Sequence, residues 1–285
     1  MRISRIHEFW RRFINAVSLA LTGVCAAIVM APVFIILAYL LMNGIRSINV
    51  EFLTSLPKSP GEPGGGVANA IVGSFYMVGL GLILSLPVGV GAGVYLAEFG
   101  RTRYAQVIRF IADVLNGVPS IVIGVSVWAL LVVPLRSFSA LAGGVALSFI
   151  MIPMIARTTE EMVRAVPNML REASLGLGAT YARTMWSVVL PAARGGIVTG
   201  VMLALARAFG EAAPLLFTAL GNRYWNFYLD RPMANLPTQI YEYAKSPYVD
   251  WHRQAWAAAL VLITVVLVLN VIARISTRER FRALR

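Results

Sequence analysis

The sequence predicts an all-α, polytopic membrane protein with about six transmembrane helices. Hydrophobic residues make up 58% of the 285 residues and charged residues only 13%, whereas soluble domains carry about 25% charged residues. The apolar residues form runs of roughly twenty or more, the length that a helix needs to cross a bilayer. The net charge of +12 comes mostly from arginines that flank these runs. This distribution is typical of membrane flanks and argues against a nucleic acid partner.

Six apolar runs are candidate spans. They cover approximately residues 14–42, 69–97, 107–134, 139–156, 192–220 and 255–275. The first run follows a basic stretch but is too long for the apolar core of a cleaved signal peptide, so we expect a retained helix. We divide the chain into residues 1–68, with a cytoplasmic tail, the first helix and an extracytoplasmic linker, and residues 69–285, the main transmembrane domain.

The distribution of basic residues predicts the orientation of the chain. Seventeen of the 25 Lys and Arg residues flank one side of the predicted spans, seven flank the other, and Arg207 lies within a span. Because Lys and Arg are enriched on the cytoplasmic side of membranes, we expect both termini in the cytoplasm. The long loop at 157–191 falls on the same side.

Two long segments fall on the outer side. The segment 43–68 contains the string SPGEPGGG, which indicates a flexible or turning linker. A phosphate-cradling loop is disfavoured there, because no strand precedes the glycines and no Lys-Ser/Thr follows them. The segment 222–254 is rich in Tyr, Trp and Phe. It is compatible with an interfacial aromatic belt, with a docking surface for an extracytoplasmic partner, or with both.

Arg207 and Glu211 stand out within the fifth predicted span. Counted from Pro191, Arg207 lies about 24 Å along a helix, deep in the hydrocarbon zone. An isolated charge there costs from about 2.5 to well over 10 kcal/mol, so the side chain should face a partner or a water-filled cavity. The i, i+4 spacing allows Glu211 to pair with Arg207, although an acid across a dimer is also possible. The pair either fixes packing or forms part of a pathway for an oxyanion, which an arginine binds through two parallel donors.

The same predicted helix carries small residues at every fourth position. They are Ala192, Gly196, Gly200, Ala204, Ala208 and Ala212. Small residues allow membrane helices to pack closely. We therefore expect a close neighbouring helix, either in this chain or in a partner.

Other charged residues are less distinctive. Arg157 ends the fourth span. It is either an ordinary basic anchor at the membrane surface, or a substrate contact or gate residue that pairs with an acid. We expect Asp113 to pair with Arg109 at i, i+4, and Glu98 to lie at the membrane interface. No Ser/His/Asp set, metal-ligand cluster or Walker-type loop occurs in the sequence, and Cys25 is its only cysteine. We therefore expect no enzyme, metal site or cofactor in this chain, and any ATP hydrolysis must occur in another chain.

A polar, helix-prone stretch from Leu170 to Pro191 lies between two apolar runs. It contains a pattern that reads E-A-S-x3-G-x9-V-x-L-P, formed by Glu172, Ala173, Ser174, Gly178, Val188, Leu190 and Pro191. This pattern resembles the EAA loop of ABC importer permeases, with Ser174 in place of Ala and Val188 in place of Ile. The resemblance implies a coupling loop that seats in a cleft of an ATPase subunit.

Longer strings resemble the permease subunits of phosphate ABC importers of the PstA type. They are PGGGVANAIVGS at 63–74, GVYLAEFGR at 93–101, VIRFIADVLNGVPSIVIG at 107–124, ARTTEEMVRAVPNMLREASLGLG at 156–178, ARAFGEAAPLLFTALGN at 206–222 and ANLPTQIY at 234–241. The resemblance implies the type I importer (MetI-like) fold in the inner membrane. Arg157 and Arg207 match arginines that the family associates with phosphate passage, and Glu211 occupies the acidic position that follows.

The resemblance also implies a set of partners. These are a second permease of the PstC type, two copies of a PstB-type ATPase that bind ATP with magnesium, an extracytoplasmic PstS-type phosphate-binding protein, inorganic phosphate and membrane lipid. A permease for sulfate or molybdate is the alternative within transporters. A channel or a carrier driven by ion gradients would leave the EAA-like pattern unexplained, and a membrane-embedded enzyme is the weakest hypothesis.

Overall fold

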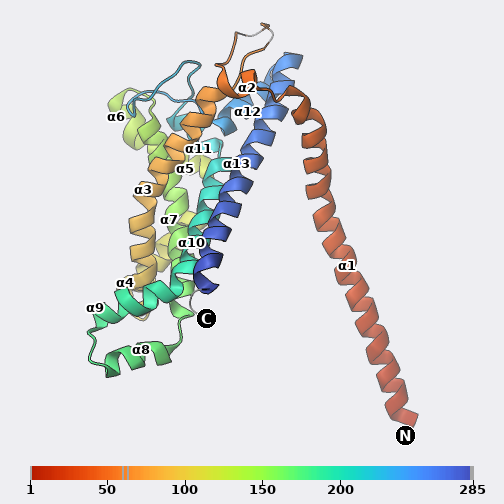
Figure 1. Cartoon of the computed structure of the whole chain (residues 1–285), viewed down its shortest axis with the longest axis vertical. Helices are drawn as coiled ribbons and strands as arrows, with labels where there is room; N and C mark the ends of the chain where they lie inside the picture. Colours follow the sequence, from red (N-terminus) through yellow and green to blue (C-terminus); the bar gives the residue numbers. More distant parts are fainter. Residues whose placement is uncertain (1, 60, 63, 283–285) are drawn as a thin grey trace.

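The computed structural model describes residues 2–59, 61, 62 and 64–282, and the regular elements in this part of the chain are helices (Figure 1). The α-helices are α1 (Arg2–Gly44), α2 (Val50–Thr54), α3 (Ala68–Glu98), α4 (Arg103–Gly117), α5 (Ser120–Val127), α6 (Val133–Leu135), α7 (Ala140–Arg164), α8 (Asn168–Gly176), α9 (Tyr181–Thr184), α10 (Leu190–Gly210), α11 (Ala213–Thr218), α12 (Leu236–Lys245) and α13 (Val249–Arg282). A short 3₁₀ turn, η1 (Ile45–Ser47), follows α1, and π-helical turns η2 (Trp128–Val132) and η3 (Met185–Val189) follow α5 and α9.

The bundle has two distinct ends. Helices α8 and α9 lie at one end, here called the loop end, and α2 and α12 lie at the opposite end, here called the linker end (Figure 1). Helix α1 begins toward the loop end and α13 runs back toward it. The two ends of the chain therefore lie toward the same end of the molecule.

Five helical segments are long and apolar enough to cross a membrane. They are Trp10–Ser47, Ala68–Glu98, Ala140–Arg164, Tyr181–Gly210 and Val249–Ile272. A sixth crossing is made by a bent pair, Arg103–Gly117 with Ser120–Leu135, whose axes meet at 105°. This agrees with the expected all-α membrane protein of about six spans.

The third predicted span, 107–134, is not one straight helix. It breaks at Val118, whose ψ of 130° is extended, because the residue before a proline, here Pro119, is kept out of the helical region. The piece Ser120–Leu135 is about 24 Å long, too short to cross the bilayer alone. Helices α4 and α5 are therefore two pieces joined at a sharp bend, and the bent pair counts as a sixth candidate span by length and composition.

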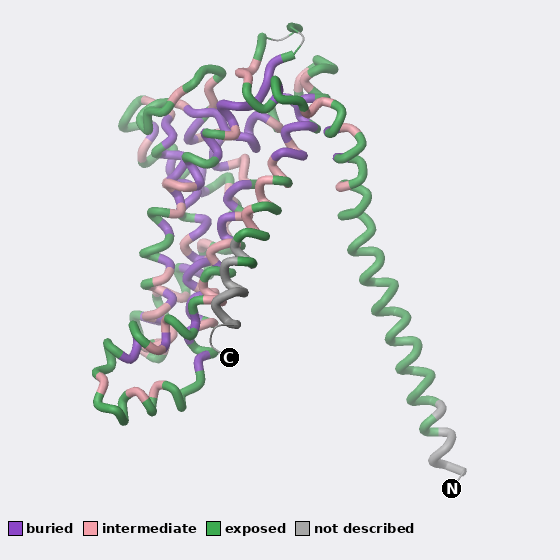
Figure 2. The backbone as a smooth tube through the Cα atoms, viewed as in Figure 1, coloured by how far each residue is buried: buried purple, intermediate pink, exposed green. Residues whose placement is uncertain are grey.

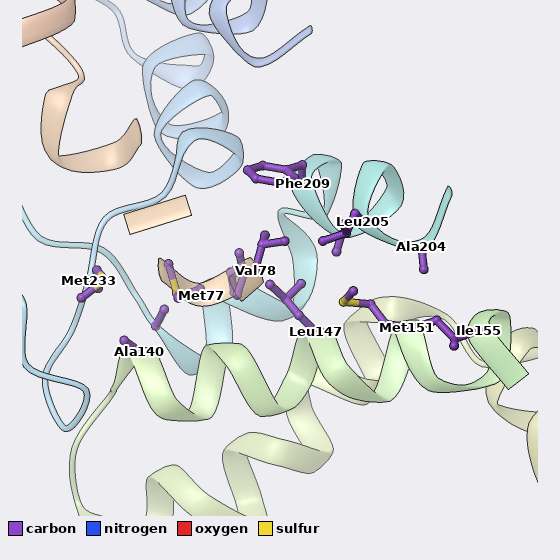
Figure 3. Packing of buried hydrophobic residues seen from close by; sticks show 13 residues of the cluster. Met77, Val78, Ala140, Leu147, Met151, Ile155, Ala204, Leu205, Phe209 and Met233 are labelled. Carbon is purple, nitrogen blue, oxygen red and sulfur yellow. The ribbon is translucent and has the colours of Figure 1, made fainter. Parts of the chain in front are cut away.

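The core lies between α3, α7 and α10 (Figure 3). Met77 and Val78 of α3 meet Leu147 and Met151 of α7, and all four are almost fully buried. Phe209 of α10 packs over the same cluster. These three helices form the rigid frame that carries the site residues described below.

The small residues of α10 pack against α7 of the same chain. A Cβ atom at Gly200 would lie 2.1 Å from Thr158 Oγ1, and one at Gly196 would lie 2.0 Å from Met162 Sδ. Ala204 is also fully buried. The close neighbour predicted from the small-residue ladder is therefore a helix of this chain.

The segment after α1 is not a free linker. Phe52 and Val67 are buried against Leu236 and Ala257 at the linker end. The backbone N–H of Val67 donates to Phe52 O at 2.9 Å, and Asn49 caps α2 by accepting from the N–H of Phe52. The expected turning linker is confirmed only in part, because these contacts anchor it to α12 and α13.

Helix α1 stands apart from the bundle and is exposed along most of its length (Figure 2). It meets α13 only near its C-terminal end, where Tyr39 and Trp256 form an edge-to-face pair with ring centroids 5.1 Å apart. Gly44 lies against the Trp256 backbone, where a Cβ atom would come within 2.8 Å of the carbonyl oxygen.

Candidate functional site

Arg207 and Glu211 form an ion pair within this chain. Arg207 Nε donates to Glu211 Oε1 at 3.3 Å. The side chain of Glu211 is 18% exposed and that of Arg207 is 42% exposed. The predicted pairing is confirmed in geometry, and the Arg207 side chain remains partly exposed.

The fifth predicted span, 192–220, is also not one continuous helix. Helix α10 ends at Gly210, Glu211 is extended with ψ of 113°, and α11 begins at Ala213. Pro214 sits at the start of α11, where its missing N–H is not needed. Arg207 therefore lies in the last turn of α10, beside a break in the backbone.

The register of α10 on α7 gives the depth of Arg207. Gly196 lies beside Met162 and Gly200 beside Thr158, so the two helices run antiparallel and Arg207 is level with about Met151. Met151 is near the middle of α7. Arg207 consequently lies near the middle of the spanning bundle.

Arg157 belongs to a second charged group, nearer the loop end. It donates through Nη1 to Glu160 Oε2 at 3.2 Å and through Nη2 to Asp113. Glu160 also accepts from Arg109 at 2.7 Å and pairs with Arg164 at 3.0 Å. The predicted pairing of Asp113 with Arg109 is wrong, because each of them bonds to a residue of α7 instead.

The two charged groups share no side chain among the described residues. By the α7–α10 register, Arg157 and Arg207 are separated by six residues along the helix axis, about 9 Å. They are two successive sites along the bundle rather than one joint site.

The stretch that resembles an EAA loop forms two arms at the loop end (Figure 1). The first arm is α8. The second arm is the start of an unbroken helical segment, Tyr181–Gly210, made of α9, η3 and α10. Pro191 was expected to begin the helix that carries Arg207, but that helix begins at Tyr181. The π turn η3 directly precedes Leu190 and Pro191 and accommodates the proline, which cannot donate a helical hydrogen bond.

Residues of the EAA-like pattern lie mainly at the surface. Glu172, Ala173, Gly178 and Pro191 are exposed, and Leu190 is half-buried. Gly178 has φ of +84° at the turn between the arms, a conformation that strongly favours glycine. This explains why the pattern requires glycine there.

Ser174, which stands where the family has Ala, joins the two arms. Its hydroxyl lies 2.9 Å from that of Thr184 in α9, and Thr184 is buried. The departure from the family pattern therefore adds a hydrogen bond between the arms.

Large apolar side chains are exposed around these arms. Met169 is 78% exposed, Leu177 90% and Trp186 76%. Beneath them, Val163, Met185 and Val189 form a small buried cluster that packs η3, at the end of the second arm, against α7. The loop end therefore presents apolar contact area with Glu172 among it.

Sequence reasoning missed two buried acids. Glu160 is only 4% exposed and holds three arginines. Glu98, expected at the interface, is 6% exposed and accepts from Arg171 and Tyr181. The spacing of Arg157 and Glu160, three residues apart, could have predicted their ion pair. No local spacing predicts the partners of Glu98, which lie 73 and 83 residues away.

The aromatic-rich segment at the linker end lines a cavity of about 270 Å³. Arg223 lies over the Trp251 ring, 5.6 Å from its centroid. Burial raises the pKa of the Glu242 carboxyl above its ordinary value, while the charges of Arg223 and Lys245 oppose the rise. Burial likewise raises the pKa of Tyr243, against its hydrogen bond with Gln239. The interfacial and docking interpretations of this segment both stay open.

No group of three or more His, Cys, Asp or Glu residues that could hold a metal occurs in the described part of the chain.

Comparison with known proteins matches residues 89–281 to the family "Binding-protein-dependent transport system inner membrane component". The chain is 43% identical to the phosphate transport system permease protein PstA of Haemophilus influenzae, covering 95% of this chain and 96% of that protein. It is 40% identical to PstA of Yersinia pestis, over 96% and 94%.

Among solved structures, the MetNI methionine ABC transporter in inward-facing conformations shares the fold. The TM-score is 0.56 at 22% identity, over 77% of this chain and 94% of that one. An amino acid ABC transporter gives the same TM-score at 15% identity.

The family match over two thirds of the sequence and the near full-length similarity to PstA proteins agree with the broken six-span bundle and the two-armed loop. The chain belongs to the inner membrane components of binding-protein-dependent transport systems and, within them, to the PstA family of permeases.

Proposed function

We propose that this chain forms half of the path by which inorganic phosphate crosses the inner membrane in an ATP-driven importer. The observation that carries the proposal is the exposed side chain of Arg207 near the middle of the bundle. A charge at that depth requires a partner or water. The second permease would supply the other wall of such a water-filled path.

The chemistry of Arg207 suits a tetrahedral oxyanion. Its guanidinium offers several donors in a fixed plane, and Glu211 engages only Nε. The terminal nitrogens stay directed away from that bond and are suited to grip phosphate oxygens. Glu211 would hold the arginine in place between transport cycles.

Arg157 would form a second, inner contact. Glu160 is buried and fixes one side of the guanidinium, whereas Asp113 is 55% exposed. An arriving anion could compete with the exposed acid for the same arginine. Two weak, successive contacts fit transport, because a single tight site would trap the ion.

The loop end would dock on the ATPase. Its exposed apolar side chains, with Glu172 and Ala173 on α8, suit an apolar cleft. ATP with magnesium would bind in that partner and not in this chain. With the ATPase docked there, the loop and both termini would lie in the cytoplasm, as the excess of basic residues on that side also favours. Phosphate would arrive from an extracytoplasmic binding protein at the linker end.

The test uses the reconstituted complex of two permeases, ATPase and binding protein. We expect Arg207→Ala to abolish phosphate uptake while the complex still assembles. Arg12→Ala, which removes an exposed arginine near the start of α1, is the matched control and should transport normally.

Normal phosphate uptake by a correctly inserted Arg207→Ala protein would show that Arg207 is not part of the phosphate path. Competition by sulfate or molybdate against phosphate would instead identify a permease for another oxyanion. Uptake without any ATPase would identify a channel or a carrier driven by ion gradients.

A further inference from the structure

Glu98 is the last residue of α3, and its carboxylate bonds to both arms of the EAA-like loop. One oxygen accepts from Arg171 of α8, and the other accepts from the hydroxyl of Tyr181. Tyr181 is the first residue of the unbroken helical segment that ends at Gly210. One side chain therefore joins α3, the first arm and the start of the second arm.

Arg171 extends this junction to α7. Its Nη2 donates to the backbone carbonyl of Val163 at 2.9 Å, near the end of α7. The arginine therefore lies between α3, α7 and α8, and only 18% of its side chain is exposed. Two helices of the bundle, α3 and α7, therefore meet the first arm of the loop at one charged contact.

Burial distinguishes this contact from an ordinary surface ion pair. The Glu98 side chain is 6% exposed, whereas that of Glu51 in its pair with Lys58 is 58% exposed. Exposed pairs are screened by water and hold their side chains weakly. A buried carboxylate with both oxygens bonded fixes the position of its partners far more strictly.

The turn between the arms offers little other restraint. Gly176 and Gly178 have open space around them, and Leu177 is 90% exposed. Apart from the turn, the arms are joined by the hydroxyl pair of Ser174 and Thr184 and by packing of α8 on α9 and η3, whereas the buried cluster beneath them contains no residue of α8. Without Glu98, motion of α8 could be taken up by the turn instead of reaching the helices.

We propose that Glu98 is a positioning residue that holds both arms of the EAA-like loop to α3, so that motion of a docked ATPase reaches the helix carrying Arg207. This inference rests on the proposed function. It assigns to Glu98 the task of keeping ATP hydrolysis coupled to transport. Glu98 touches neither the substrate nor the ATPase in this role.

The experiment compares Glu98→Gln, Tyr181→Phe and the control Glu51→Gln in the full complex. Two quantities are measured: phosphate imported per ATP hydrolysed, normalised to assembled complex, and hydrogen exchange of the backbone amides of residues 168–184. Glu98→Gln should lower the import ratio about fivefold or more and speed exchange in the loop. Tyr181→Phe, which removes one of the two donors, should show a smaller change in the same direction. Glu51→Gln should match wild type.

An unchanged import ratio or unchanged loop exchange in Glu98→Gln would overturn the proposal. If Glu98→Gln fails to assemble, Tyr181→Phe decides, and a wild-type ratio in that variant would also overturn it. A wild-type complex that imports no phosphate contradicts the proposed function instead. In that case the exchange measurement still decides whether Glu98 holds the arms.

Discussion

At the scale of single residues, buried carboxylates determine where the arginines of this permease point. Glu160 gathers Arg109, Arg157 and Arg164 at one end of α7, and Glu98 holds Arg171. Removing one partner of such a buried pair leaves an uncompensated charge, which costs about 3–5 kcal/mol. Arg207 differs in its depth, because it lies near the middle of the bundle while 42% of its side chain stays exposed. This deep, exposed arginine is therefore the one suited to a mobile ligand within the membrane.

Glu242 gives a test of pH dependence at the linker end. Burial raises the pKa of its carboxyl in the folded chain. The folded state therefore binds this proton more readily than the unfolded state. The free energy of unfolding rises as the pH falls from the pKa of Glu242 in the folded chain to the ordinary pKa of a glutamate. Above that window the charged carboxylate destabilises the fold.

We expect Glu242→Gln to raise the unfolding midpoint of the purified protein at about pH 7.5, with the gain disappearing near pH 4. The measurement is the difference in midpoint between variant and wild type at the two pH values. A variant less stable than wild type at the higher pH, or a gain that persists at the lower pH, would contradict this.

The residue scale also shows what the sequence could predict. The Arg207–Glu211 pair was predictable, because i, i+4 neighbours meet wherever a helix forms, and the contact holds even though α10 ends one residue before Glu211. Asp113 and Arg157 are 44 residues apart. Their pairing depends on how α4 packs on α7, which no local spacing reveals, so the local pairing with Arg109 was wrong.

At the scale of elements, close packing of α10 on α7 sets the register between the two charged groups. Gly200 and Gly196 lie against Thr158 and Met162 with no room for a side chain. The position of Arg207 relative to Arg157 therefore depends on these glycines. Small residues at a helix crossing in a membrane have this general role.

Gly200→Val should therefore destabilise the bundle, by at least about 1 kcal/mol, because a forced larger side chain strains a packed interface. The measurement is the free energy of unfolding in detergent. Gly79→Val in α3, where no atom lies within 4 Å of the added Cβ, is the control and should change stability by less than about 0.5 kcal/mol. Equal effects of the two substitutions would show that the α7–α10 contact is not the cause.

Composition predicted which elements exist but not where two of them break. Apolar runs identify spans by length, and a run that bends at Val118 or stops at Gly210 is still apolar. Pro119 lay inside a predicted span, and prolines are tolerated in membrane helices, so it did not by itself signal a 105° bend. Pro191 likewise did not predict the π turn that precedes it, because prolines are tolerated in membrane helices.

At the scale of the whole molecule, one continuous helix joins the loop end to the middle of the bundle. From Tyr181 to Arg207 the chain stays helical through α9, η3 and α10 without a break. The contact with α8 and the outward-facing arginine are thus on connected rigid elements. Physical continuity permits coupling but does not by itself establish it, which is why the import ratio is the decisive measurement for Glu98.

Helix α1 makes few contacts with the rest of this chain and leaves its apolar surface to lipid or to a partner. Only 6% of its most apolar window is buried, and apolar side chains such as Leu19, Ile28 and Phe34 are exposed around it. A helix that is apolar on all sides needs apolar surroundings on all sides. The outward-facing Arg207 independently calls for a second wall.

We expect α1 to lie against the proposed second permease in the assembled complex, and Cys25 provides the means to test it. Cys25 is exposed in the middle of α1 and is the only cysteine in the sequence. A photoreactive group attached to it should crosslink to the second permease in native membranes. The control carries the Ile83→Cys substitution in a Cys25→Ser background, because Ile83 is exposed on α3. The same photoreactive group at that position reports how often the reagent captures a neighbour from another spanning helix. Reaction of Cys25 with lipid alone would show that α1 lies free in the bilayer and that the second wall of the path is built without it.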